Sequence, residues 1–241
     1  MSDAPNDEPI RVLIVDDQRT FAEALRSAVQ QMPDIAVVGV AEDGREAVAL
    51  AQDVEPHVVL MDVEMPAMDG IEATRQIKRA RPDAQIVILS SYRDTALLAR
   101  AVGAGAAGYL SKDSALPEVA AAVRSAAAGR PLLDPEEVRE AMTRFGSDSD
   151  AEMATARLVE RLTPREVEIL QLMAEGTPSE QIASTLFMSP HTLRTHVAHV
   201  LRKLEVHSRL EALSMAVRYG KVVIPKGRGE GGQHGARRRK P

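Results

Sequence analysis

The sequence predicts a doubly wound α/β domain built on a five-stranded parallel sheet, followed by a separate all-α domain. Three observations lead to this prediction. Short apolar runs alternate with amphipathic segments over the first half of the chain, this alternation fades near residue 130, and only helical patterns follow Leu162. Alternating strand and helix segments are typical of a parallel sheet with helices on both faces. The chain has 241 residues, which is enough for two domains of ordinary size.

Five short apolar runs are the expected strands. All but the last are rich in β-branched residues, and none has much internal polarity, as expected for strands that are buried on both faces. These strands are Ile10–Val15, Ile35–Val40, His57–Met61, Gln85–Leu89 and Ala106–Leu110.

The amphipathic segments between these runs are the expected helices. They are Arg19–Gln31, Arg45–Asp53, Ile71–Ala80, Asp94–Val102 and Leu116–Ala128. Helix-breaking residues support their limits, since Pro33 follows the first helix and Asp43-Gly44 precedes the second. Five strand–helix units in a row predict one doubly wound domain with right-handed crossovers, which we expect over residues 9–130.

The pattern after residue 130 indicates a linker over residues 131–157, because Gly129-Arg130-Pro131 ends the last helix and Gly146–Asp150 is polar and glycine-containing. We expect a compact domain of four short helices over residues 158–223. Thr163-Pro164-Arg165-Glu166 has the cap, proline and glutamate of a helix start. The expected helices are Pro164–Glu175, Pro178–Leu186, Ser189–Leu204 and His207–Tyr219. Residues 224–241 are expected to be a disordered basic tail.

Charge is distributed unevenly along the chain. The net charge is −5, which by itself argues against a nucleic-acid binder, but the acidic residues gather near the start and the basic residues near the end. This asymmetry favours an acidic regulatory half and a basic binding half. With no cysteine, no secretion signal and no apolar run of membrane-spanning length, we expect a cytoplasmic protein that does not interact with membranes.

Three carboxylates are expected to meet at one edge of the sheet. Asp16 and Asp17 end the first strand and Asp62 ends the third, and these strands are neighbours in a flavodoxin-like order of 2-1-3-4-5. Three like charges are costly together unless a cation lies among them, and oxygen ligands at an open site suit Mg²⁺. Ser90 and Lys112 follow the fourth and fifth strands, so a hydroxyl and an ammonium join this edge. Such a set suits a phosphoryl group, whose oxygens need charge neutralisation.

These residues also resemble the receiver domain of two-component response regulators. The run Leu60–Gly70 (LMDVEMPAMDG) is highly specific, and the resemblance covers about residues 9–130. It implies that Asp62 accepts the phosphoryl group from a sensor histidine kinase. It further implies that Asp17, Asp62 and the backbone carbonyl of Glu64 hold Mg²⁺, with Asp16 helping through water. It also implies that Ser90 and Lys112 contact the phosphoryl oxygens and that Tyr109 is an aromatic switch.

The C-terminal half resembles the LuxR-type helix-turn-helix that accompanies receivers in the NarL/FixJ subfamily. The match covers about residues 158–223 and includes Ser189-Pro190-His191-Thr192-Leu193. A recognition helix presents its exposed face to base edges in the major groove. The resemblance implies that Arg194, Thr195 and Ala198 face bases, and that Thr192, His196, Arg202 and Lys203 contact phosphates. The family usually has Asn and Glu at the positions of Ser179 and Gln181, which puts a phosphate contact from Ser179 in doubt.

We therefore expect a bacterial response regulator that is phosphorylated on Asp62, binds promoter DNA as a homodimer and is not an enzyme. Three alternatives remain open. An aspartyl-phosphate phosphatase needs a second aspartate two residues after the nucleophile, where this chain has Glu64. A pseudo-receiver would bind DNA without taking phosphate. A quorum-type regulator would need an apolar ligand cavity in place of the carboxylate pocket.

Overall fold

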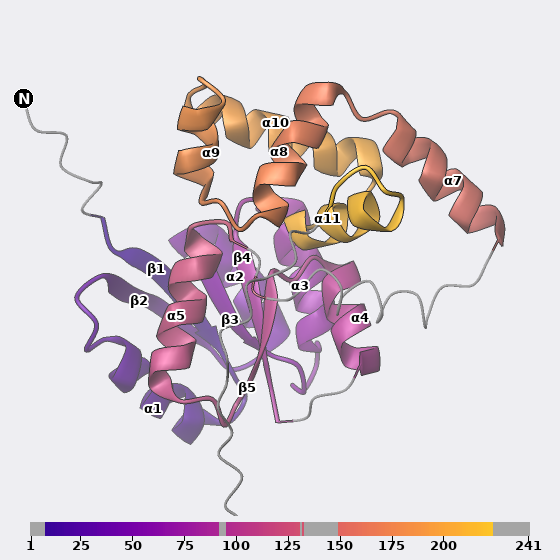
Figure 1. Ribbon diagram of the computed structural model, residues 1–241. Coiled ribbons are helices and arrows are strands. Elements are labelled where there is room, and N and C mark those ends of the chain that lie inside the picture. The colour runs from indigo at the N-terminus through magenta and orange to yellow at the C-terminus, as the bar shows by residue number, and fades with distance from the viewer. Residues whose placement is uncertain (1–7, 92–94, 131, 133–148, 224–241) are drawn as a thin grey trace, which may run out of the picture.

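The protein is described by a computed structural model that covers residues 8–91, 95–130, 132 and 149–223. Figure 1 shows a sheet flanked by helices in the lower half and a group of helices above it. The expected basic tail over residues 224–241, and the linker residues 131 and 133–148, lie outside the described residues.

The five predicted strands are present and pair in parallel in the predicted order, β2-β1-β3-β4-β5. They are β1 (Ile10–Val15), β2 (Ile35–Ala41), β3 (Val58–Asp62), β4 (Gln85–Ser90) and β5 (Gly108–Ser111). β1 lies between β2 and β3, so the carboxyl ends of β1 and β3 are adjacent.

The last strand begins later than the sequence analysis predicted. The prediction was Ala106–Leu110, whereas β5 begins at Gly108. The backbone N–H of Ala106 donates to the carbonyl of Ala101, 3.0 Å away, and so closes the end of the preceding helix. This residue is therefore used by the helix and cannot pair with β4.

Helices cover both faces of the sheet. They are α1 (Arg19–Val29), α2 (Gly44–Val54), α3 (Gly70–Ala80), α4 (Thr95–Ala104) and α5 (Leu116–Ala127). Strand side chains alternate between the faces, so Leu13 and Met61 pack with α2, α3 and α4, whereas Ile14 and Leu60 pack with α1 and α5. All four side chains are 0% exposed, which gives the domain two apolar layers around a rigid sheet.

The C-terminal domain is all-helical within the described residues. Its helices are α7 (Ser149–Glu160), α8 (Pro164–Ala174), α9 (Ser179–Thr185), α10 (Pro190–Leu204) and α11 (Arg209–Arg218). Thr163 and Glu166 form the predicted capping box at the start of α8, and the Ser189 hydroxyl caps α10 as predicted. Helix α7 differs from the expected linker over residues 131–157. The helix begins inside that segment and continues into the predicted helical domain, where its residue Val159 is fully buried in the core.

The two domains touch at the amino-terminal edge of the sheet. The backbone N–H of Ser179 donates to the carbonyl of Ala128 at the end of α5, at 3.3 Å. Helix α11 contacts α4, and Leu210 belongs to the apolar cluster of the N-terminal domain. The C-terminal domain therefore rests on the edge opposite to the carboxyl ends of the strands.

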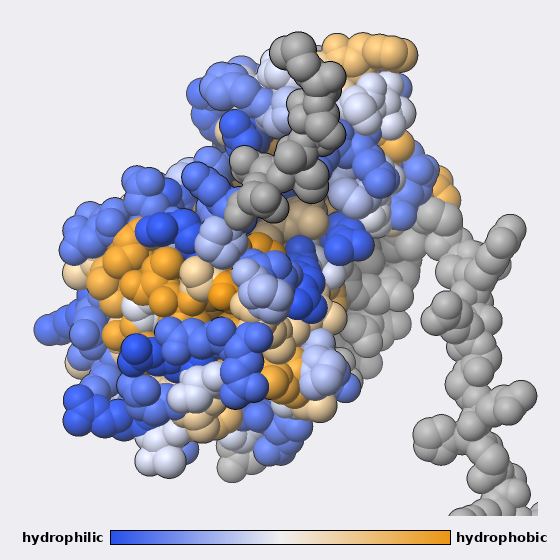
Figure 2. Space-filling model, turned by 90° about the vertical axis from the view of Figure 1, so that its left-hand side faces the viewer, coloured by the Kyte–Doolittle hydropathy of each residue, from blue (hydrophilic) through white to orange (hydrophobic). Residues whose placement is uncertain are grey.

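Figure 2 shows the side of the molecule that carries the edge strand β2, where an apolar patch is surrounded by hydrophilic surface. On this strand Val37, Val38 and Val40 are partly exposed.

Among the described residues, none of the helices has the length and apolar character required to cross a bilayer.

Candidate functional site

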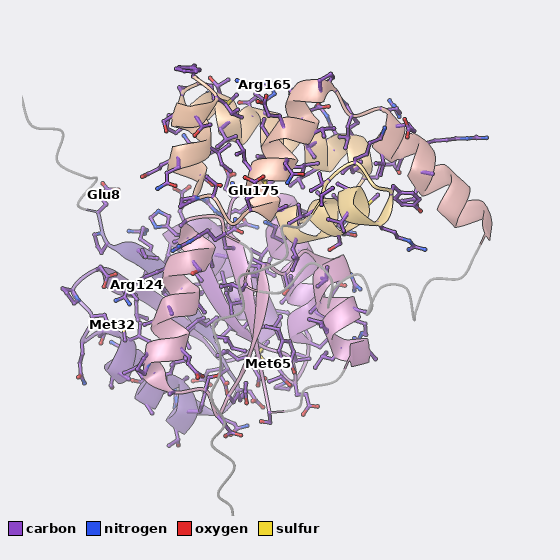
Figure 3. All side chains as sticks on the ribbon, in the orientation of Figure 1. Glu8, Met32, Met65, Arg124, Arg165 and Glu175 are labelled. Carbon is purple, nitrogen blue, oxygen red and sulfur yellow. The ribbon has the colours of Figure 1, made fainter. Side chains whose placement is uncertain are left out.

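The predicted carboxylate cluster is present where β1 and β3 end side by side. Oxygens of Asp16, Asp17 and Asp62 all lie within 4.8 Å of one another. Asp16 and Asp62 are 0% and 4% exposed, whereas Asp17 is exposed. In Figure 3, the labelled Met65 lies in the loop after β3 and marks this edge, far from Glu175 in the C-terminal domain.

Lys112 forms ion pairs with the two buried aspartates. Its ammonium lies 2.7 Å from Asp16 Oδ2 and 2.8 Å from Asp62 Oδ2. Burial is the largest influence on Asp62 and raises the pKa of its carboxyl, while the hydrogen bond and charge of Lys112 oppose this effect. Burial works against the charge of Lys112, but the interactions with Asp16 and Asp62 outweigh this effect and raise the pKa of Lys112. Lys112 thus favours the ionised carboxylate of Asp62.

The residues of this cluster fit a divalent cation. Asp16 Oδ2 is buried and has no hydrogen-bond partner among the described residues, although the Lys112 ammonium lies 2.7 Å away as an ion pair. A buried acceptor without a donor is costly, and a cation would satisfy it. Mg²⁺ prefers carboxylate oxygens and retains water, which suits two buried carboxylates beside the exposed Asp17.

The loop after Asp62 is shaped by Gly70. A Cβ atom at this position would lie 1.8 Å from the backbone oxygen of Asp62, so no other residue fits without moving the chain. The N–H of Gly70 donates to the carbonyl of Val63 at 3.0 Å. Asp69 caps α3 by accepting the N–H of Glu72 at 2.7 Å. The specific run around Met65 therefore determines the shape of the loop and supplies no further reactive group.

Ser90 and Tyr109 lie on the strands beside β3. Ser90 ends β4 at the same edge as Asp62 and is 5% exposed. The backbone N–H of Lys112 donates to the Ser90 carbonyl at 2.9 Å, which fixes the lysine loop to β4. Tyr109 is 7% exposed and packs in the cluster that contains α4. Lys112 thus contacts the carboxylate cluster and Ser90 lies at the same edge of the sheet, while Tyr109 connects β5 to the layer of α4.

Phe21 also belongs to this site, although it was not among the predicted site residues. The Lys112 ammonium lies 5.1 Å from the centroid of its ring. Phe21 and the Lys112 side chain also line one apolar pocket between α1 and α5. A cation over an aromatic face is attracted by the ring electrons. The available signal was an aromatic residue one turn into the helix that follows Asp16-Asp17.

Helix α10 has the two faces expected of a recognition helix. Leu193, Val197, Val200 and Leu204 are buried in the core of the C-terminal domain. The predicted base-facing residues Arg194, Thr195 and Ala198 are all exposed. Among the predicted phosphate contacts, Thr192 and Arg202 are exposed, whereas His196 is partly buried.

Lys203 differs from the other predicted phosphate contacts. Its ammonium lies 2.8 Å and 2.5 Å from the two carboxylate oxygens of Glu166. Glu166 is 5% exposed and also accepts the backbone N–H of Thr163 at 2.7 Å. Burial raises the pKa of Glu166, but the bonds to Lys203 and Thr163 outweigh it and lower the pKa overall. Lys203 therefore joins α10 to the start of α8, a role that the sequence did not indicate.

The beginning of α10 faces the N-terminal domain across a cleft of about 490 Å³. Pro190, Leu193 and Arg194 line it from α10. Arg81 and Asp83 line it from the other domain. The part of a recognition helix that enters DNA first therefore lies beside the sheet domain.

Two family descriptions match this chain. A response regulator receiver domain matches residues 12–124, and the luxR family of bacterial regulatory proteins matches residues 160–216. Solved structures are similar as well. A LuxR-family two-component response regulator from Aurantimonas sp. SI85-9A1 is 33% identical, covers 57% of this chain and 98% of its own, and has a TM-score of 0.51. RcsB from Salmonella typhimurium is 26% identical, covers 88% and 99%, and has a TM-score of 0.50.

Relatives of similar length share both halves. The transcriptional regulatory protein LiaR from Bacillus subtilis is 40% identical over 209 residues, which cover 87% of this chain and 97% of LiaR. The response regulator VraR from Staphylococcus aureus is 36% identical over 213 residues, which cover 88% and 99%. The chain therefore belongs to the bacterial two-component response regulators that join a receiver domain to a LuxR-type DNA-binding domain and regulate transcription.

Proposed function

We propose that a sensor histidine kinase phosphorylates this protein on Asp62 and that phosphorylation controls its binding to promoter DNA. The observation that supports this most directly is the cluster of Asp16, Asp62 and Lys112, with ion-pair distances of 2.7 Å and 2.8 Å. A carboxylate poised beside an ammonium at the open edge of the sheet suits phosphoryl transfer, in which positioning and charge neutralisation supply most of the catalysis. We expect the protein to act in the cytoplasm, where the kinase domain would meet it.

In the proposed reaction, a carboxylate oxygen of Asp62 attacks the phosphorus atom of a phosphohistidine. The bond from phosphorus to the imidazole nitrogen breaks, and an acyl phosphate forms on Asp62. Mg²⁺, held by Asp16, Asp17, Asp62 and the backbone carbonyl of Glu64, would supply charge neutralisation for the phosphoryl oxygens. Lys112 opposes the effect of burial on the pKa of Asp62 and so favours its ionised form, and it would then turn its ammonium toward a phosphoryl oxygen. The Ser90 hydroxyl would donate a hydrogen bond to another phosphoryl oxygen.

The switch that we propose uses Ser90 and Tyr109. When the Ser90 hydroxyl moves toward the phosphoryl group, it leaves space at the end of β4 into which the Tyr109 ring can turn. The ring packs against the α4 layer, so its movement changes the packing of that helix. Helix α4 in turn contacts α11 of the effector domain.

For DNA binding, we propose that α10 enters the major groove and that Arg194, Thr195 and Ala198 face bases. Thr192, His196 and Arg202 would contact phosphates. Lys203 is the weakest member of this set, because its ammonium is bonded to Glu166. A helix fills the groove, so the receiver domain beside Arg194 would collide with the duplex. DNA binding therefore requires the domains to separate, and we expect the bound form to be a homodimer on a two-fold related site.

The test of the phosphorylation step is the intact mass of the protein after incubation with acetyl phosphate and Mg²⁺. We expect one phosphoryl adduct on the wild-type protein and none on Asp62→Asn, which has the same shape and no nucleophile. Asp69→Asn is the matched control, because Asp69 follows in the same loop as a helix cap. A folded wild-type protein without any adduct would favour a pseudo-receiver and contradict the proposal.

A further inference from the structure

The cleft between the two domains gathers arginines from both sides. Arg81 follows α3 in the receiver domain, Arg194 lies on α10, and Arg209 begins α11. The cleft has a volume of about 490 Å³, which is within the range of small-molecule sites. It lies at the amino-terminal edge of the sheet and is separate from the phosphorylation pocket at the carboxyl edge.

Arg81 and Arg209 carry many more N–H donors than there are acceptor atoms of other residues bound to them. Arg81 Nη1 donates to Glu55 at 2.8 Å, but its Nε is buried and has no hydrogen-bond partner. Arg209 Nη1 donates to the Ser179 hydroxyl at 3.0 Å, and no carboxylate of the described residues lies at ion-pair distance from it. A guanidinium carries five N–H donors, and a desolvated cation without a counter-ion is costly.

The pKa of Arg209 also indicates that its charge is poorly compensated. Burial is the largest influence and lowers this pKa. The negative charge of Asp83 opposes the effect of burial, whereas the positive charge of Arg194 adds to it. The acidic side chains that line the cleft are Asp83 and Glu180. No ion pair between described residues joins either of them to the three arginines. The fold therefore holds three guanidinium groups around one space, and among the described residues only Arg81 has a carboxylate at ion-pair distance, that of Glu55.

We infer that this cleft binds a small anion with phosphate groups, which links the receiver domain to the effector domain. Guanidinium forks match phosphate oxygens with two parallel hydrogen bonds, and the unpartnered Nε of Arg81 offers one donor of such a fork. An anion held by Arg81 on one side and Arg209 on the other stabilises the closed arrangement. Because Arg194 is also the proposed base-reading residue, the anion and DNA compete. This last consequence rests on the proposed function, whereas the site itself does not.

The experiment is isothermal titration of the full-length protein with sodium pyrophosphate, without Mg²⁺ and at constant ionic strength. We expect saturable binding of one anion. Arg81→Gln and Arg209→Gln each remove a charged donor, so each should weaken the affinity for pyrophosphate by about tenfold or more. Arg81→Lys keeps the charge but loses the fork, so it should restore only part of the affinity. Arg202→Gln is the control, because Arg202 lies on the exposed face of α10 outside this cleft. Thermal melts verify that each variant folds.

Three results would overturn the inference. Absence of saturable binding to the wild-type protein would mean that water fills the cleft. Equal affinity of Arg81→Gln and wild type, with a loss in Arg202→Gln, would place the anion on the DNA-binding face. Full rescue by Arg81→Lys would indicate attraction by net charge alone. The competition is tested separately, by measuring whether pyrophosphate weakens duplex binding by the wild type more than by Arg81→Gln. If pyrophosphate binds as expected but does not weaken duplex binding, the anion site is supported and the competition at Arg194 is wrong.

Discussion

Closure of the two domains depends on a close contact at Gly129. A Cβ atom at this residue would lie 1.9 Å from Arg209 Nη1 and 2.6 Å from the Ser179 hydroxyl oxygen. In Gly129→Ala the guanidinium must swing aside and lose its 3.0 Å hydrogen bond to Ser179. A hydrogen bond to a charged group contributes about 1.5–3 kcal/mol, and we take the lower value because Arg209 is partly exposed. About 1.4 kcal/mol changes an equilibrium tenfold, so the ratio of closed to open protein should fall by about tenfold.

Gly129→Ala also adds backbone strain, and Gly176→Ala is the control that separates this strain from the clash with Arg209. Gly129 has a φ angle of 70°, and Gly176 at the end of α8 has a φ angle of 73° with no atom within 4 Å of its Cβ position. Alanine in this left-handed region costs about 1–2 kcal/mol at either site. Gly176→Ala therefore reproduces the strain without the clash, and only Gly129→Ala should open the domains.

The assay is fluorescence anisotropy of the unphosphorylated protein with a labelled promoter duplex at fixed salt, since affinity for DNA depends steeply on salt. When the protein is mostly closed, the apparent affinity scales with the open fraction, so we expect about a tenfold gain for Gly129→Ala and no change for Gly176→Ala. Small-angle scattering should show a larger radius of gyration only for Gly129→Ala. Equal behaviour of the two variants would refute the role assigned to this contact.

Three further predictions concern single side chains. Burial raises the pKa of Glu211 to about 7, so its contribution to stability is complete below its ordinary value of 4.5 and is lost as pH rises through about 7. Glu211→Gln should therefore raise the melting temperature at pH 8 but not at pH 4, and an equal gain at both pH values would exclude titration as the cause. Phe21→Leu should keep the fold and slow phosphorylation by acetyl phosphate by about threefold, because about 0.5–1 kcal/mol of cation–π attraction to Lys112 is lost. Phe21→Tyr keeps an aromatic ring and should retain the rate. Identical rates for the leucine and tyrosine variants would show that Phe21 is not part of the site. Lys203→Met should lower the free energy of unfolding because it leaves the buried Glu166 unpaired, and adding Glu166→Gln to the same chain should recover most of the loss. If the salt dependence of DNA binding also falls by about one unit of slope in Lys203→Met, Lys203 contacts a phosphate as well.

Local patterns were sufficient to predict most of the fold and the acidic pocket. Strands that are buried on both faces stand out as apolar runs, and Asp16 and Asp62 could be brought together because parallel strands place their carboxyl ends at one edge. The start of β5 was predicted too early, since nothing in the sequence tells that the N–H of Ala106 closes α4. Helix α7 was missed because its apolar contact, through Val159, is made with distant helices.

Contacts between distant side chains could not be predicted. Lys203 looked like a phosphate contact because Lys on a recognition helix usually is one, and its partner Glu166 was already explained as a helix cap. The packing of Arg209 against Gly129 depends on how the two domains meet, which local propensity does not encode. The sequence identifies groups that share an element or an edge, whereas pairs that join separate elements require the structure.

The two edges of the sheet have different roles in the proposed function, and this limits how a signal from phosphorylated Asp62 would travel. Asp62 lies at the carboxyl edge, while the effector domain rests on the amino-terminal edge, so the signal must pass along the length of the sheet. The strands are poor carriers, because β3 is buried over its whole length and its neighbours fix it on both sides. Helix α4 is better suited, since it packs through small residues such as Ala101 and Ala104. At its end, a Cβ atom on Gly105 would lie 3.1 Å from the backbone oxygen of His207, just before α11. A small shift of α4 therefore reaches the effector domain directly, and the contact that it disturbs lies beside the one that Arg209 makes with Ser179.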